Sequence, residues 1–376
     1  MKIVFVGGGA STLVAANLLL EFTDAQITIV TNKPKLGHKL SMTGNGKCNL
    51  SPIEDNPEAY NCPELLECLF KDITLSEYLE TLARLGIPTR ALRNQGYYPV
   101  SENASNVVEI LTNNLKKYAT IIYDEVENYS QNKVFLKSDQ IIPFDKLVFA
   151  TGGKSYPDTG SDGSVFSLLE KHGYEIRELK PSLCPIKVKE NVKSLFGARN
   201  HASMSLIKDN KVIYQEDGEI MFKKDALSGI AVMNMSSFIA HEDGDYQIQI
   251  DFLMGKGIAC GYRNCLDFLL GYVNRPIAEY ILKKYNLTGK EPSDEHLKEL
   301  NEGLTKLTFN YKSLYGFESA QVTSGGISLY EIDSNFQSQR ENNVYFIGEM
   351  LDIDGLCGGY NLRFALSSAM KLVKNL

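Results

Sequence analysis

Hydrophobic residues open the chain in two short continuous runs, with a longer apolar segment between them. Residues 2–6 and 26–30 are typical of buried strands, and residues 12–22 are apolar almost all round, as in a helix packed against a sheet. A glycine-rich turn at residues 7–11 separates the first strand from the helix. This order predicts a βαβ unit, whose crossover should be right-handed.

Strand and helix patterns continue to alternate in two other parts of the chain. Before residue 181 we expect strands at 121–126, 134–137 and 146–150 and helices at 103–118 and 162–172. After residue 342 we expect a strand at 343–347 and a helix at 361–373 with one apolar face. The two ends of the chain are therefore predicted to share one α/β fold.

The section between these two parts has a different pattern. Strands are expected at 211–215, 219–222 and 246–253, and in the last of these apolar and polar residues alternate, so that one face is buried. Helices are expected at 264–273, 276–285 and 294–306. This section predicts an inserted unit of antiparallel strands and helices.

Composition narrows the function classes. The 376 residues carry 39 basic and 46 acidic side chains, a net charge of −7, which argues against nucleic acid or an anionic membrane as a partner. Seven cysteines without a CxxC pair favour a reducing, cytoplasmic compartment. The five histidines form no HxxxH or Cys/His cluster, so we expect no metal site. The apolar runs are too short for a membrane span, and glycines interrupt the first run, which argues against a signal peptide.

The glycine turn has the spacing of a phosphate-binding loop. In Gly7-x-Gly9-x-x-Thr12 the first glycine allows a tight turn, and the second lets backbone N–H groups approach a pyrophosphate at the helix N-terminus. Thr12 replaces the third glycine and should push helix and strand slightly apart. Thr31 replaces the acidic residue expected at the end of the second strand. Dinucleotide affinity should therefore be weaker, unless Asn32 or another group compensates.

Three further blocks of sequence make the prediction more specific. They are Thr43-Gly44-Asn45-Gly46-Lys47-Cys48-Asn49 within residues 36–50, Ala150-Thr151-Gly152-Gly153 within residues 150–163, and Thr323-Ser324-Gly325-Gly326-Ile327 followed by residues 345–362, which end in Gly358-Gly359-Tyr360-Asn361-Leu362. The residues of these blocks and their order along the chain resemble the YhiN/BaiN-like family of NAD(P)/FAD-dependent oxidoreductases, also known as aminoacetone-oxidase-like FAD-binding enzymes. The resemblance covers most of the chain, and its C-terminal block is the most specific part.

The resemblance implies an α/β fold with a Rossmann-type two-dinucleotide-binding FAD domain and an inserted β-barrel and helical unit. It places the FAD-binding domain at residues 1–183 and 318–376, the barrel-like insert at 184–257 and 307–317, and the helical insert at 258–306. It implies FAD as the bound cofactor, with NADH or NADPH as the candidate electron donor.

The resemblance also assigns cofactor contacts by position, although it names no catalytic acid or base. The implied FAD-binding residues are Gly7, Gly9, Ala10 and Ser11 at the pyrophosphate, Lys39, Thr43, Lys47, Cys48 and Asn49 along the cofactor, Val126 at the adenine through its backbone, Thr151 and Gly152 at the second glycine turn, Gly348, Glu349 and Asp352 by the ribityl and phosphate region, and Gly359, Tyr360, Asn361 and Leu362 at the flavin ring.

The predicted last helix suits the flavin ring on physical grounds. A helix that begins near Asn361 points backbone donors and the positive end of its dipole outward, and reduced flavin carries negative charge on its N1–C2=O2 edge. Asn361 could instead be a plain helix N-cap, or serve in both ways. Tyr360 could stack near the flavin or simply fill the core.

Some residues of the chain depart from the family pattern, and two cysteines are candidates for a redox role. Lys47 stands where the family has an arginine, which keeps the charge but loses the planar fork. Lys223 and Lys224 follow Phe222 where the family has a Thr-His pair, which leaves the choice of substrate open. Cys48 and Cys357 lie near the implied flavin, but lone cysteines are mostly small buried residues, so we expect neither to be catalytic.

The sequence therefore predicts an FAD-dependent oxidoreductase that acts on a small molecule. The reaction is either NAD(P)H-linked reduction of an activated double bond or oxidation of an amine by oxygen. A flavin-binding protein without catalysis is a rival, motivated by Thr12, Thr31, Lys47 and the Lys223-Lys224 pair. A flavoenzyme that modifies RNA is disfavoured by the acidic balance and the lack of a basic stripe. The sequence does not indicate an oligomeric state.

Overall fold

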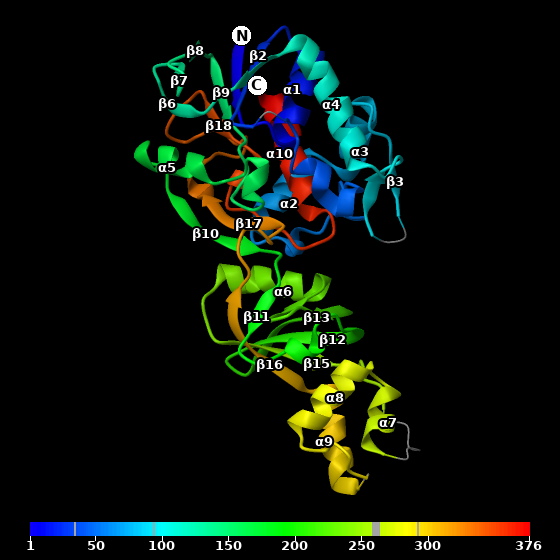
Figure 1. The fold of residues 1–376 in the computed structure, drawn as a ribbon. Helices are drawn as coiled ribbons and strands as arrows, with labels where there is room; N and C mark the ends of the chain where they lie inside the picture. The colour runs from blue at the N-terminus through cyan, green and yellow to red at the C-terminus, as the bar shows by residue number, and fades with distance from the viewer. Residues whose placement is uncertain (34, 93–94, 258–263, 292) are drawn as a thin grey trace. The chain divides into compact units, whose positions relative to one another are not determined.

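The computed structural model describes residues 1–33, 35–92, 95–257, 264–291 and 293–376. The chain forms two units, one from Met1–Lys180 with Gln321–Leu376 and the other from Pro181–Ala320 (Figure 1). Each unit has its own sheet or barrel and its own apolar core. Residues 258–263, at which the expected helical insert begins, lie outside the described ranges.

A five-stranded parallel sheet forms the centre of the first unit (Figure 1). Its strands in spatial order are β18 (Val344–Phe346), β9 (Lys146–Phe149), β1 (Lys2–Val6), β2 (Gln26–Thr31) and β5 (Thr120–Tyr123). Because β1 pairs in parallel with both β2 and β9, the carboxyl ends of these three strands meet at one edge. β18 pairs with β9, so the two ends of the chain share one sheet, and the predicted Rossmann-type fold is confirmed.

Three helices pack together beside this sheet, namely α1 (Ala10–Phe22), α4 (Ala104–Tyr118) and α10 (Tyr360–Asn375) (Figure 1). α1 contacts both of the others. This position explains why α1 is apolar almost all round, since Leu13 and Leu19 are fully buried together with most of the helix.

A three-stranded antiparallel sheet follows β5 along the chain. It consists of β6 (Val126–Ser130), β7 (Lys133–Leu136) and β8 (Ile141–Pro143), and helix α5 (Ser164–Lys171) follows later. The prediction of a single strand over residues 121–126 is wrong. The N–H of Asp124 donates to the carbonyl of Thr31, and at this point the chain leaves the parallel sheet.

Several short elements of the first unit are missing from the sequence predictions. They are α2 (Pro63–Asp72), α3 (Leu75–Arg84), β3 (Thr89–Ala91), β4 (Tyr97–Pro99) and the strand pair β10 (Ile176–Ser182) and β17 (Val322–Ile327). α2 shows why, because its buried stripe is only Leu66, Leu69 and Phe70. A pattern of so few turns is hard to distinguish from a loop.

A closed six-stranded barrel forms the centre of the second unit and confirms the predicted barrel. Its strands in spatial order are β11 (Ile186–Val188), β14 (Ala226–Ser228), β13 (Lys211–Phe222), β12 (Arg199–Lys208), β15 (Tyr246–Asp251) and β16 (Leu307–Leu314). The two strands predicted at 211–215 and 219–222 are one strand, because β12 pairs with β13 along its length and carries the polar residues between them into the ladder.

Helices complete the second unit. They are α6 (Ile230–His241), which packs on β13, and α7 (Cys265–Leu270), α8 (Arg275–Lys284) and α9 (Asp294–Thr305). The last three share one apolar cluster with the barrel residues Leu307 and Phe309. Among the described residues of both units, no helix is long and apolar enough to cross a membrane.

Candidate functional site

The first glycine turn joins β1 to α1 and lets the chain at the end of β9 approach closely. Gly7 has a φ of +106°, and a Cβ atom here would lie 2.4 Å from the carbonyl oxygen of Ala150 at the end of β9. Gly9 has an ordinary extended backbone, with φ −84° and ψ −174°, and the helix begins at the next residue, Ala10. Ala10 and Ser11 therefore lie in the first helical turn, where backbone N–H groups lack partners within the helix. Such a turn suits an anionic ligand.

The two departures from the dinucleotide pattern have local partners. The hydroxyl of Thr12, which replaces the third glycine, donates to the carbonyl of Gly7 at 2.8 Å and ties the helix to the turn. Thr31 is buried at the end of β2. Its neighbour Asn32 donates through Nδ2 to Oδ2 of Asp162 at 3.4 Å. A carboxylate from a distant loop thus lies beside the position where the pattern expects an acidic residue.

The glycine turn after β18 lies against the start of α1. A Cβ atom at Gly348 would lie 2.4 Å from Oγ of Ser11. The Ser11 hydroxyl donates to the carbonyl of Ala365 in α10 at 2.9 Å, and the N–H of Gly348 donates to Oγ of Ser368 at 3.1 Å. The structure therefore brings together the first turn, the C-terminal turn and the last helix.

An ion pair joins the segment after β2 to the C-terminal turn. Nζ of Lys39 lies 2.7 and 2.8 Å from the two carboxylate oxygens of Glu349, and both side chains are mostly buried. Ser155 accepts from Lys39 at 2.6 Å and donates to Glu349 at 3.0 Å. The N–H of Thr323 donates to the same carboxylate at 3.1 Å. Glu349 is thus held in place by groups from three other segments.

Two hydroxyls near the second glycine turn have no hydrogen-bond partner within the part of the chain that the structure describes. Thr151 Oγ1 and Ser161 Oγ are buried side-chain atoms without a hydrogen bond among the described residues. Between them lies Gly152, with a φ of +74°, at which a Cβ atom would lie 2.8 Å from Ser161 Oγ and 3.6 Å from a carboxylate oxygen of Glu349. Buried polar groups are nearly always hydrogen-bonded, so these two hydroxyls are suited to contact a polar ligand.

The predicted segment from Thr43 to Asn49 divides into an exposed part and a buried part. Lys47 is exposed and forms an ion pair with Glu102 at 3.2 Å. The hydroxyl of Thr43 donates to the carbonyl of Leu40 at 2.8 Å. Asn49 Oδ1 is buried without a partner among the described residues, and it lies 2.8 Å from the place of a Cβ atom at Gly359. Asn49 therefore faces the start of the last helix, and Lys47 extends toward Glu102.

Cys48 is fully buried, and burial raises the pKa of its thiol to about 11, although a hydrogen bond with Thr43 opposes this shift. The reactive thiolate is therefore scarce near neutral pH. We expect iodoacetamide at pH 8 to label the exposed Cys68 rapidly in the folded protein and to leave Cys48 unmodified until urea unfolds the chain. Peptide mass spectrometry measures both sites. Equal labelling of Cys48 and Cys68 in the folded protein would contradict this assignment.

The start of α10 is tied to the loop before it. Tyr360 is the first residue of the helix, its carbonyl accepts from the Tyr60 hydroxyl at 2.7 Å, and the two rings pack edge to face. Asn361 is not a helix N-cap. Its amide donates to the carbonyl of Gly355 at 2.6 Å and its oxygen accepts from the N–H of Gly355 at 2.9 Å. Asn361 therefore closes the preceding loop, and the backbone N–H groups of the first helical turn stay available.

Arg363 anchors the same turn from inside the protein. Its guanidinium is fully buried and binds Asp55 with two hydrogen bonds of 2.8 Å. The group lies 4.5 Å from the ring centres of both Phe70 and Tyr78, and it also donates to the carbonyl of Ile73. Arg363 thus fixes α10 against α2 and α3.

Asp352 and Val126 lie farther along their own segments. The N–H of Asp352 donates to the carbonyl of Ile327 at 3.0 Å, and its own carbonyl accepts from Asn61 at 3.1 Å. Val126 is half-buried at the start of β6. It follows two residues after Asp124, where the chain leaves β5 and bonds to Thr31 at the end of β2.

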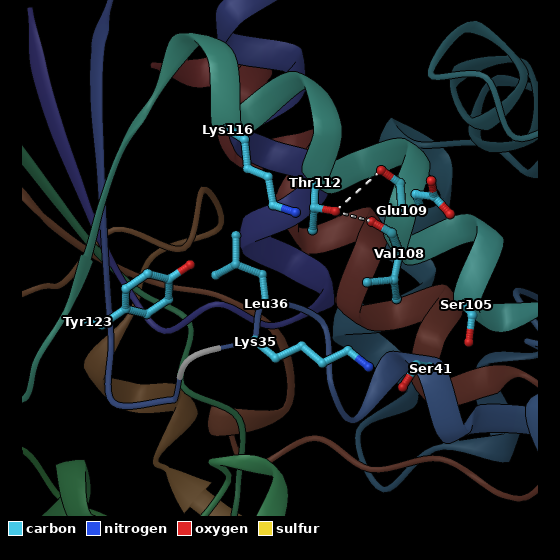
Figure 2. A pocket seen from close by; sticks show the side chains of 9 residues that line it. All are labelled: Lys35, Leu36, Ser41, Ser105, Val108, Glu109, Thr112, Lys116 and Tyr123. Atoms are coloured by element: carbon cyan, nitrogen blue, oxygen red, sulfur yellow. Dashed lines mark hydrogen bonds between the residues drawn. The ribbon is translucent and has the colours of Figure 1, made fainter.

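A separate cavity of about 280 Å³ opens between the segment after β2 and α4 (Figure 2). Its lining residues are Lys35, Leu36, Ser41, Ser105, Val108, Glu109, Thr112, Lys116 and Tyr123. Leu36 separates it from the first glycine turn, since a Cβ atom at Gly8 would lie 2.5 Å from Leu36 Cδ2. None of these lining residues is a predicted cofactor residue. The candidate cofactor site is therefore the glycine turns, not this cavity.

Sequence reasoning missed several residues of the site. Ser155, Ser161 and Thr323 lie inside the quoted blocks, but their hydroxyls carry no signal of their own in a sequence. Asp162 and Arg363 become visible only through partners that lie 130 and 308 residues away. The one available signal was Arg363 itself, a charged residue close to the apolar face of the last helix.

Comparison with known proteins gives matches over the full chain. The family described as HI0933-like protein Rossmann domain matches residues 1–375. The chain is 30% identical over 393 residues to a 3-dehydro-bile acid delta(4,6)-reductase of Clostridium scindens, covering 97% of this chain and 96% of that protein. It is 24% identical over 398 residues to a ribosomal RNA dihydrouridine synthase of Escherichia coli, covering 99% and 97%. A solved flavocytochrome c3 fumarate reductase aligns with a TM-score of 0.47 and 12% identity, over 99% of this chain and 76% of that one.

Proposed function

Because the chain belongs to the HI0933-like Rossmann-domain family, which confirms the resemblance found in its sequence, we propose that it binds FAD across the two glycine turns of the first unit and reduces a small molecule with NAD(P)H. The chain is an FAD-dependent oxidoreductase. The observation that carries the proposed site is the pair of buried, unpartnered hydroxyls of Thr151 and Ser161 beside Glu349.

The residues present fit a dinucleotide. The first turn of α1 offers backbone N–H groups to a pyrophosphate, and the absence of a side chain at Gly9 leaves room for close approach. Thr151 and Ser161 offer hydroxyls that would gain partners from phosphate or ribityl oxygens. Asn49 Oδ1 offers an unpartnered acceptor near the start of α10. Each of these polar groups would gain a partner from a bound FAD.

FAD would supply the electron-carrying ring, and the chain supplies position and polarity. Asn361 and Arg363 fix the first turn of α10 so that its N–H groups and dipole can favour negative charge on the flavin. Lys39 and Ser155 hold the Glu349 carboxylate in place, where it would accept from ribityl hydroxyls of a bound FAD. Cys48 takes no part in electron transfer, because its thiol stays protonated.

Asp162 is proposed to replace the acidic residue missing at Thr31, as a partner for the adenosine ribose. Changing Asp162 to Asn removes the charge, while the amide oxygen can still accept from Ser164 at the start of α5. We expect the Kd for FAD to rise roughly 10- to 100-fold, which corresponds to the loss of one charge-assisted hydrogen bond. A fluorescence titration measures it, with Asp158→Asn in the same loop as the matched control. Equal weakening in both variants would contradict this role.

We propose NAD(P)H as the electron donor and a small molecule as the electron acceptor. The relative at 30% identity is named as a reductase of a bile acid, which favours reduction over amine oxidation. Relatives at 24% identity are named as ribosomal RNA dihydrouridine synthases, but the net charge of −7 disfavours a phosphate backbone as partner. We therefore propose a small molecule with an activated double bond.

Anaerobic mixing of the FAD-loaded protein with NADH or NADPH tests the donor. Rapid bleaching of the flavin absorbance is expected with at least one of them. Bleaching by primary amines alone would support the oxidase alternative. Protein that binds FAD but is bleached by neither class of donor would favour a flavin-binding protein without catalysis.

A further inference from the structure

A cluster of charged side chains surrounds Tyr315 in the second unit. Nζ of Lys187 lies 5.0 Å from the centre of the Tyr315 ring, and Nζ of Lys223 lies 5.3 Å from it. The Tyr315 hydroxyl donates to Asp225 at 2.6 Å, and Lys187 lies 3.6 Å from the other oxygen of the same carboxylate. Two ammonium groups thus share one aromatic ring and are at most about 10 Å apart.

The strand register of the barrel brings these residues together. Lys187 lies in β11 between Ala226 of β14 and Ser313 of β16, while its neighbours Ile186 and Val188 point into the buried core. The alternation along β11 therefore directs Lys187 outward. Lys223 begins the short turn from β13 to β14, which its N–H closes by donating to the carbonyl of Ala226.

The cations of this cluster exceed its anions. Asp225 is already engaged by the Tyr315 hydroxyl, which lowers the pKa of the carboxyl, and by Lys187. Burial and the Asp225 hydrogen bond raise the pKa of Tyr315 to about 12, so the phenol remains a donor. Among the described residues, no carboxylate forms an ion pair with Lys223, and Lys224 beside it is exposed. Glu318 and Lys223 both influence the pKa of the Cys184 thiol, but the carboxylate in direct contact with the cluster is Asp225. Around the Tyr315 ring, the described residues thus place two lysines against one contacting carboxylate.

We propose that Lys187, Lys223 and Tyr315 form a binding site for the carboxylate or phosphate group of a small anionic molecule. Two lysines held near one ring repel each other, and an anion between them relieves that repulsion. Each ammonium has three donors on a flexible stem, so both can turn toward one anionic group while the ring supports their methylene chains. The site explains the Lys223 and Lys224 pair, which the proposed flavin chemistry does not use.

The test is NMR of the full-length protein after reductive methylation with ¹³C-formaldehyde, which labels lysines and keeps their charge. The Tyr315 ring should shift the Lys187 and Lys223 signals from the positions of exposed lysines. Acetate and methyl phosphate are titrated separately at constant ionic strength. At least one of these probes should shift the Lys187 and Lys223 signals in a saturable manner. The probe that does so shows whether the site takes a carboxylate or a phosphate.

Lys208 is the matched internal control. It lies 5.3 Å from the ring centre of Tyr246 in the same barrel, but it is already paired with Glu242. Its signal should not respond to either probe. In Lys223→Gln the Lys187 response should be lost, whereas Lys211→Gln at the far end of β13 should leave it intact. No movement of the two signals, or parallel movement of all three, would overturn the proposal. This binding test does not require FAD, so it fails or succeeds separately from the proposed function.

Discussion

Replacing Arg363 with alanine is expected to lower the free energy of unfolding by about 3–5 kcal/mol. The guanidinium is fully buried, and its two hydrogen bonds to Asp55 and one to the carbonyl of Ile73 would lose their donor. The space between Phe70 and Tyr78 would also become a cavity. The mostly buried carboxylate of Asp55, left without its partner, accounts for most of the expected loss.

Urea denaturation followed by circular dichroism measures this change. Lys374→Ala is the control, because Lys374 lies on the same helix as Arg363 and forms an exposed ion pair with Glu77 of α3, worth less than about 1 kcal/mol. Arg363→Lys should fall between the two, since lysine keeps the charge but cannot form the two-pronged contact with Asp55. A loss in Arg363→Ala no larger than that in Lys374→Ala would show that the buried pair does not anchor the helix.

Substitutions at Gly7 and Gly9 of the first turn should separate folding from cofactor binding. Gly9→Ala is expected to fold like the natural chain, because its backbone angles suit alanine and the nearest atom to the new Cβ is 3.7 Å away. Its affinity for FAD should nevertheless fall about tenfold or more, because the methyl group occupies the space through which a pyrophosphate reaches the turn.

Gly7→Ala should damage both properties. Its φ of +106° is strained for alanine by roughly 1–2 kcal/mol, and the new Cβ atom would overlap the carbonyl oxygen of Ala150 at 2.4 Å. Thermal unfolding and FAD titration of both variants give the comparison. Natural FAD affinity in Gly9→Ala would contradict a pyrophosphate at this turn, even if Gly7→Ala behaves as expected.

The parts of the fold that sequence predicted best are those set by local patterns. The strand at residues 2–6 is β1 without a shift, and the helices expected at 103–118 and 294–306 differ from α4 and α9 by one residue at one end. Buried strands and amphipathic helices can be predicted because their apolar residues recur with the period of the backbone. Prediction from local patterns failed where pairing between strands decides the structure. In β13 the polar residues in the middle stay extended because they pair with β12.

The site followed the same rule. The glycine turns could be predicted from the sequence because their positions require glycine. At Gly7 and Gly348 the backbone has a positive φ, and a Cβ atom would lie 2.4 Å from a neighbouring oxygen. Asn361 carried an ambiguous signal, and the structure resolved it as a loop clamp on Gly355. The ion pair of Lys39 with Glu349 spans 310 residues, and no spacing rule connects two positions so far apart.

The visible absorption spectrum of the purified full chain, taken after incubation with FAD and removal of the free cofactor, tests the central claim most directly. We predict a flavin spectrum with one FAD per chain, and a clear loss of bound flavin in Gly9→Ala measured in the same way. A chain that is folded but remains colourless after this treatment would contradict the claim that its glycine turns hold a flavin.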